Sequence, residues 1–164
     1  MSRISLYSQP WISEESARRT LGNITQQDLG FLYSILDSHP EYSSIILTLI
    51  DIIHKACEIY LARATDVSQD RIDRLVQGFI EKTSEFNATS PGGHILIWPF
   101  FIVGVECTNA RDREFAIGQL QHLWRWTGFG NTLYAIETLQ KIWSSHSGSR
   151  WTKAIVDQVD VFIM

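Results

Sequence analysis

Cysteine is scarce in this 164-residue sequence, which contains only Cys57 and Cys107. Two cysteines are too few for a disulfide framework or an all-cysteine zinc site. Both lie in apolar runs with helical patterning, where a free cysteine behaves as a small buried hydrophobic residue. The sequence therefore excludes a disulfide-stabilised secreted module and predicts no metal site built on cysteine.

An excess of positive charge is also missing. The chain has 14 Lys and Arg against 18 Asp and Glu, which gives a net charge of −4. Residues 1–90 are acidic overall, and residues 91–164 are balanced, so neither half carries a basic cluster. Proteins that bind nucleic acid depend on clustered Lys and Arg. We expect no direct contact with nucleic acid and assign no DNA-binding residue.

Long hydrophobic runs are absent as well. The most apolar stretches, Ile45–Ile53 and Ile95–Val105, fall short of the roughly 20 residues that span a bilayer. The first 20 residues lack the apolar core of a secretory signal. These features predict a soluble, intracellular chain without a membrane partner.

What the sequence does contain is typical of a helical globular protein. Hydrophobic residues make up 45% of the chain, and six Trp contribute to its 12% aromatic content. Apolar residues recur at helical spacing in most segments, and the longest such segment, 42–64, is apolar on two faces. A helix of that kind is usually surrounded by others, so we expect it at the centre of the core.

The predicted fold is all-α. We expect one domain over residues 1–164, built as an irregular bundle of about six to eight helices with no sheet of consequence. The segment 87–93, rich in turn-forming residues, is predicted to be an internal loop. Pro99 either begins a helix or kinks one.

No group of residues indicates a reaction. His54, Cys57 and Glu58 can share one helical face, but zinc would need further ligands and the sequence offers no second pair at metal spacing. The glycines of Gly128-Phe129-Gly130 follow a helix rather than a strand, so they indicate a turn and not a nucleotide loop. We predict no catalytic residue, no metal, no cofactor and no enzymatic activity.

Two tryptophans flank Arg125 near the end of one predicted helix. Trp124 fits the apolar face of that helix, whereas Trp126 does not. Trp124 is therefore predicted to lie in the core. Trp126 is the better candidate for contact with a partner protein, and packing of its ring against a neighbouring helix is the more common alternative.

Residues 94–143 carry an ordered series of motifs. In chain order they are Trp98-Pro99, Phe101, Gly104, Glu106, Asp112-Arg113-Glu114, Thr127-Gly128, Gly130-Asn131 and Ile142-Trp143. This series resembles the C-terminal stretch of the fungal-specific transcription factor domain, which is found downstream of binuclear zinc-cluster DNA-binding modules. The final 20 residues are compatible with the resemblance, and residues 1–93 share only helical patterning.

The resemblance implies a regulatory, non-enzymatic helical domain that works in the nucleus through protein partners, either co-regulators or a second copy. Such domains are usually longer and follow six cysteines and a basic linker, which this sequence lacks. The chain is thus expected to be the C-terminal portion of a larger regulatory domain that does not touch DNA, with any small-molecule effector unknown. The alternative is a stand-alone helical domain that binds a small molecule or another protein.

The matched residues also have expected physical roles. Gly104 presents no side chain, so it allows close helix packing. Gly128 and Gly130 give backbone freedom at a turn, and Asn131 is predicted to cap the following helix. Glu106 lies in an apolar segment and needs a partner, which we expect to be Arg111 or Arg113. Trp98, Asp112 and Trp143 complete the set of family positions.

Overall fold

The computed structural model describes residues 38–144 except for positions 66, 85 and 88. The described chain forms five α-helices and two short 3₁₀ helices, and it contains no strand. In order these are η1 (Pro40–Tyr42), α2 (Ser43–Ala64), α3 (Gln69–Ser84), η2 (Gly93–Leu96), α4 (Ile97–Glu106), α5 (Ala110–Thr127) and α6 (Gly130–Ser144).

The all-α prediction is therefore confirmed, and the expected six to eight helices exceed the five that the described residues form. Two further segments with helical patterning, 29–36 and 151–164, lie outside the described residues.

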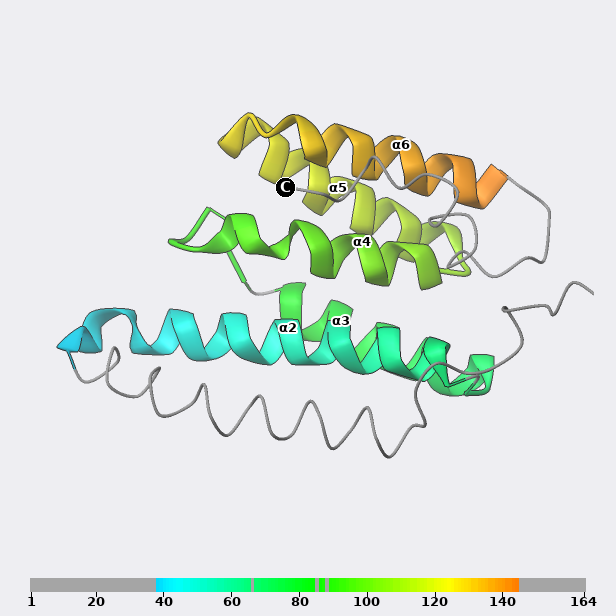
Figure 1. The fold of residues 1–164 in the computed structure, drawn as a ribbon, viewed down its shortest axis with the longest axis horizontal. Helices are drawn as coiled ribbons and strands as arrows, with labels where there is room; N and C mark the ends of the chain where they lie inside the picture. The colour runs from blue at the N-terminus through cyan, green and yellow to red at the C-terminus, as the bar shows by residue number, and fades with distance from the viewer. Residues whose placement is uncertain (1–37, 66, 85, 88, 145–164) are drawn as a thin grey trace, which may run out of the picture.

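The helices are stacked in three layers (Figure 1). Helices α2 and α3 pack together on one side, α5 and α6 pack together on the other, and α4 lies between the two pairs. Nine of the ten residues of α4 are buried, and the exception is Trp98. This short, almost wholly apolar helix is the centre of the bundle because it contacts all four others.

Among the described helices, α4 occupies the centre rather than the helix predicted over 42–64. Helix α2 buries one stripe of residues, which consists of Leu49, Ile52, Ala56, Ile59 and Ala62. Its other apolar residues, such as Ile46, Ile50 and Ile53, are only partly buried. Helix α4 takes the central position. Its 10 residues span about 15 Å, whereas the 22 residues of α2 span about 33 Å.

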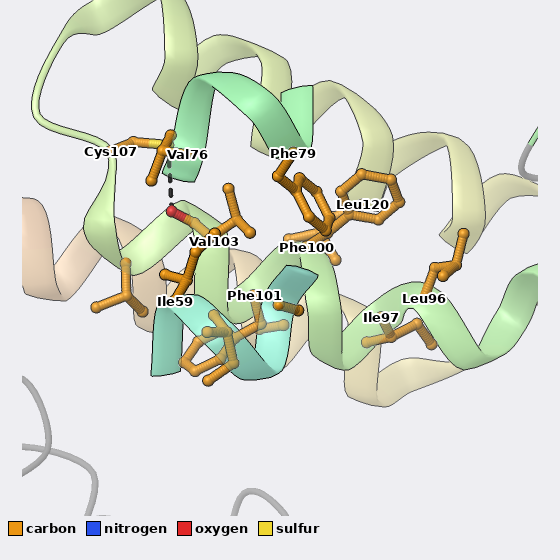
Figure 2. Close-up of a cluster of buried hydrophobic side chains, with 14 of the residues drawn as sticks. Ile59, Val76, Phe79, Leu96, Ile97, Phe100, Phe101, Val103, Cys107 and Leu120 are labelled. Atoms are coloured by element: carbon orange, nitrogen blue, oxygen red, sulfur yellow. Dashed lines mark hydrogen bonds between the residues drawn. The ribbon is translucent and has the colours of Figure 1, made fainter. Parts of the chain in front are cut away.

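The core around α4 contains closely packed aromatic rings (Figure 2). Phe79 and Phe100 meet edge to face at 5.7 Å between ring centroids, and Phe115 approaches Phe100 at 6.3 Å. Edge-to-face pairs of this kind stabilise a core beyond the area they bury. Cys107 follows the last residue of α4, and its thiol donates a hydrogen bond to the carbonyl of Val103 over 3.3 Å.

Local sequence signals explain most helix ends. Asn109 caps α5, because its side-chain oxygen accepts a hydrogen bond from the backbone N–H of Asp112 over 2.9 Å. Gly128 ends the same helix in the left-handed conformation, with φ of 70°. Pro99 is the third residue of α4, within the first turn, where the missing N–H breaks no hydrogen bond.

Candidate functional site

The residues of the family pattern gather at two ends of the bundle. One end, which we call the α4–α5 junction, contains Glu106, Cys107, Asn109, Asp112 and Arg113, where α4 stops and α5 begins. The other end lies around the turn between α5 and α6, at the opposite end of α5 (Figure 1). The side chains at these two ends are used in different ways.

Glu106 is paired with Arg63 of α2. The carboxylate is 3% exposed, and both of its oxygens accept hydrogen bonds from the guanidinium, with Nε to Oε1 at 2.8 Å and Nη2 to Oε2 forming the second arm. Arg63 also donates from Nη2 to Oε1 of Gln69 over 2.7 Å. The expected partner, Arg111 or Arg113, is wrong, because the pairing joins residues 43 positions apart rather than neighbours.

Asp112 is the second buried carboxylate at the junction. It is 6% exposed, and its Oδ2 accepts hydrogen bonds of 2.6 Å from the side-chain amides of Asn109 and Gln77. Asn109 belongs to the start of α5, and Gln77 belongs to α3. Asp112 therefore connects the first turn of α5 to α3. Its negative charge also interacts favourably with the positive end of the α5 dipole.

Arg113 and Trp143 join the junction to α6. The guanidinium of Arg113 lies 5.1 Å from the centroid of the Trp143 ring, and its Nε donates to the carbonyl of Cys107 over 3.0 Å. The indole N–H of Trp143 donates to the carbonyl of Gly104 over 3.0 Å. The carbonyl of Cys107 belongs to the C-cap of α4, and the carbonyl of Gly104 belongs to its last turn, where it also accepts a hydrogen bond from the backbone N–H of Cys107 over 3.2 Å.

Gly104 is the point of closest approach between α4 and its neighbours. A Cβ atom at this position would lie 2.8 Å from Cδ1 of Leu139 and 3.3 Å from Cβ of Ala116. These distances are shorter than ordinary carbon contacts. Gly104 thus lets α4 pack against α5 and α6 at once, as its place in the family pattern implies.

The charged side chains of the junction hold helices together, and the thiol of Cys107 donates to a carbonyl of its own helix. Burial raises the pKa of the Cys107 thiol to about 12, with a smaller contribution from the carboxylate of Asp112, so this cysteine stays a protonated thiol at neutral pH. Cys57 is half-buried, and burial raises the pKa of its thiol as well. Among the described residues no group of three or more His, Cys, Asp or Glu is placed to hold a metal ion.

The α5–α6 turn is built from the second half of the family pattern. Gly128 ends α5, Gly130 begins α6, and the backbone N–H of Thr132 donates to the carbonyl of Phe129 over 3.1 Å. The prediction that Asn131 caps α6 is wrong. Asn131 lies inside the first turn, and its Oδ1 is buried without a hydrogen-bond partner among the described residues.

Large apolar side chains are exposed around this turn. We call the following set the aromatic corner: Trp124, Trp126, Phe129, Leu133 and Tyr134, which are 39%, 48%, 49%, 39% and 61% exposed. The burial predicted for Trp124 is wrong. It follows Leu123, which is fully buried, and one residue further along a helix turns a side chain about 100° away from the buried stripe.

The exposed surface continues onto the beginning of α4. The ring of Phe129 contacts the ring of His94 edge to face at 6.3 Å, which brings η2 next to the aromatic corner. Ile95 and Trp98 are 42% and 37% exposed, and Trp98 contacts Tyr60 of α2 at 6.4 Å between centroids. Seven of the ten exposed large hydrophobic residues in the described chain thus lie in residues 95–98 and 124–134.

Sequence reasoning located the motif positions but missed several partners. Arg63 and Gln77 belong to segments with no family signal, and only the need of a buried carboxylate for a partner pointed towards them. Phe129, Leu133 and Tyr134 were not expected at the surface. Of the predicted site residues, Trp126 belongs to the aromatic corner, and almost half of its side chain is exposed.

The described helices show no membrane-crossing segment, because none of them is both long and apolar enough. No curated protein and no solved structure matches the chain significantly. One family model does match, over residues 2–164, and it describes a fungal specific transcription factor domain. The match includes residues 2–93, where the sequence alone offered helical patterning and no motif. The chain therefore belongs to the family of fungal specific transcription factor domains.

Proposed function

We propose that this chain is a regulatory domain that does not contact DNA and that acts in the nucleus by binding other proteins through the aromatic corner. Membership of the family supports a role in transcription, and transcription factor domains of this family are not enzymes. The observation that carries the proposal is the exposure of Trp126, Phe129 and Tyr134 around one turn.

The aromatic corner consists of large side chains, four of which are aromatic. A large aromatic side chain presents roughly 150–250 Å² when it is fully exposed. At the exposures given above, the five side chains of the aromatic corner together present on the order of 500 Å² of apolar surface. Exposed Trp and Tyr are also the side chains that most often dominate binding between proteins.

The charge of the chain supports the absence of DNA contact. A net charge of −4 and a balanced C-terminal half provide no cluster of Lys and Arg for phosphates. We therefore expect the purified chain to bind a random DNA duplex and a promoter duplex equally weakly at physiological salt. Tight binding to one sequence in a fluorescence anisotropy titration would contradict this part of the proposal.

The regulatory role is tested by fusing the full chain to an unrelated DNA-binding module in a fungal reporter strain. The wild-type fusion is expected to change reporter output relative to the module alone. Tyr134→Ser and Trp126→Ala should abolish that change while the fusion remains at the same level in the nucleus. The matched control is Gln121→Ala, which alters an exposed residue of α5 and should leave reporter output as it is in the wild type. Equal output from wild type and both corner variants would refute the proposed role of this surface.

A further inference from the structure

The segments that form the turn of the aromatic corner contain no acidic residue, and the first carboxylate after them is Glu137, which is exposed on α6 one turn beyond Tyr134. Between Phe115 and Ile136 the chain has no Asp or Glu, and the charged side chain is Arg125, with His122 one turn before it. Residues 87–104, which contain η2, include one ionisable side chain, that of His94. The segments that form this surface therefore carry cationic or neutral side chains in a protein whose net charge is −4.

Arg125 is placed to contribute to binding. It lies between Trp124 and Trp126 in the last turn of α5, and it is exposed. Among the described residues no carboxylate pairs with it, in contrast to Arg63, which is held by Glu106. A guanidinium that has no carboxylate partner and is flanked by two exposed indoles offers both a charge and an apolar surround to an incoming side chain.

We propose that the aromatic corner binds an acidic amphipathic segment of another protein, in which apolar side chains alternate at helical spacing with Asp and Glu. The apolar side of such a segment would cover Trp126, Phe129 and Tyr134, and its carboxylates would meet Arg125 at the edge of the contact. This inference rests on the proposed function and names the chemistry of the partner. Complementary charge at the rim of an apolar contact selects the partner and speeds association.

The size of the surface fits a short segment rather than a whole domain. An exposed apolar area on the order of 500 Å² is smaller than the roughly 800 Å² that each partner buries in a standard interface. A helix of about four turns, on the order of 15 residues, is 22 Å or so in length and can lie across η2 and the first turns of α6. We therefore expect binding in the micromolar range, typical of short regulatory segments.

The test uses three labelled synthetic peptides of equal length with the full chain, read by fluorescence anisotropy. The first has Leu and Phe at helical spacing and Glu at the remaining positions. The second replaces every Glu by Lys, and the third replaces every Leu and Phe by Ser. The acidic amphipathic peptide is expected to bind, the Lys peptide to bind at least about tenfold more weakly, and the Ser peptide not to bind.

Variants of the chain assign the binding to the aromatic corner. Arg125→Glu should weaken binding of the acidic peptide by roughly tenfold and strengthen binding of the Lys peptide, since it reverses the charge of the side chain that lies between Trp124 and Trp126. Tyr134→Ser should weaken the binding of both peptides. Arg74→Glu, the same reversal at an exposed position of α3, is the matched control and should leave both affinities unchanged. Far-ultraviolet circular dichroism checks that each variant is folded.

The outcomes separate this inference from the proposed function. Equal affinity for the acidic and Lys peptides, or full binding by Arg125→Glu, overturns the inference about charge, whereas the reporter test still decides the regulatory role. Failure of the acidic peptide to bind also overturns the inference, and sedimentation of the wild-type chain then shows whether a second copy covers the corner. If the corner variants change neither peptide binding nor the reporter, the inference and the proposed function both fail.

Discussion

At the α4–α5 junction, two carboxylates are buried and each is held by a side chain from another helix: Glu106 by Arg63 of α2, and Asp112 by Gln77 of α3 together with its neighbour Asn109. At the aromatic corner, by contrast, large rings are exposed and Arg125 pairs with no carboxylate of the described residues. The same family pattern runs through both ends. The comparison shows that, among the described residues, the side chains at the junction are engaged in contacts within the fold, whereas the large side chains at the corner remain exposed.

The pairing of Arg63 with Glu106 is expected to give the largest effect on stability. Arg63→Ala leaves a carboxylate that is 3% exposed without its guanidinium, and breaking a buried pair in this way costs about 3–5 kcal/mol of the free energy of unfolding. Urea denaturation followed by circular dichroism measures the loss.

Two further variants control this experiment. Arg74→Ala removes an exposed arginine of α3 and should change the free energy of unfolding by less than about 0.5 kcal/mol. Replacing both partners, Arg63→Met with Glu106→Leu, should recover much of the stability that Arg63→Ala loses, because the buried carboxylate of Glu106 is then removed together with its partner. A small loss in Arg63→Ala would mean that Glu106 is not held as described.

A glycine pair compares the close contact at the junction with open helix surface. Gly104→Ala places a Cβ atom 2.8 Å from Leu139, and overpacking of this kind costs about 1–3 kcal/mol. Gly118→Ala, in α5, meets no atom within 4 Å and should stabilise the protein by about 0.5–1 kcal/mol, since alanine favours a helix. Both free energies come from the same denaturation series. Opposite signs are predicted, and equal effects would contradict the close approach of α4 to α6.

The burial of Cys107 predicts a loss of stability in alkali. The pKa of this thiol is raised from 9.0 to about 12 in the folded protein, so the unfolded chain loses its proton first as the pH rises. The stability linked to this thiol is complete below pH 9 and falls as the pH increases towards 12, by roughly 1.4 kcal/mol per pH unit.

Denaturation of wild type and Cys107→Ala between pH 8 and pH 10.5 isolates this effect, because the other titrating groups are common to both. The wild type should show the steeper decline above pH 9. Parallel curves for the two proteins would show that the thiol is accessible to water in the folded state.

The smallest effect on stability is expected at the aromatic corner. Trp126→Ala and Tyr134→Ser remove side chains that are 48% and 61% exposed, and each should change the free energy of unfolding by about 0.5 kcal/mol or less. Thermal denaturation provides the comparison with wild type. A loss of several kcal/mol in either variant would place that residue in the core and end the contrast between the two ends.

Local features of the fold were predictable from sequence, whereas distant pairings were not. Periodicity predicts that Ala116 and Leu120 are buried, and both are. Gly128 is predicted to end its helix, because a glycine at a helix end affects only the adjacent residues. The partner of Glu106 lies 43 positions away, so only the packed arrangement of α2 and α4 reveals it. The exposure of Trp124 depends on where the buried stripe of α5 ends, which periodicity defines only to within one side chain.

The central claim is that the junction fixes the fold while the aromatic corner is free to bind. Hydrogen–deuterium exchange of the full chain, measured with and without the acidic amphipathic peptide, tests both halves at once. We predict that amides of α4 and the start of α5 exchange slowest in both samples, and that the peptide slows exchange in η2 and around the α5–α6 turn. Faster exchange at the junction than at the corner, or protection confined to other helices, would contradict the account.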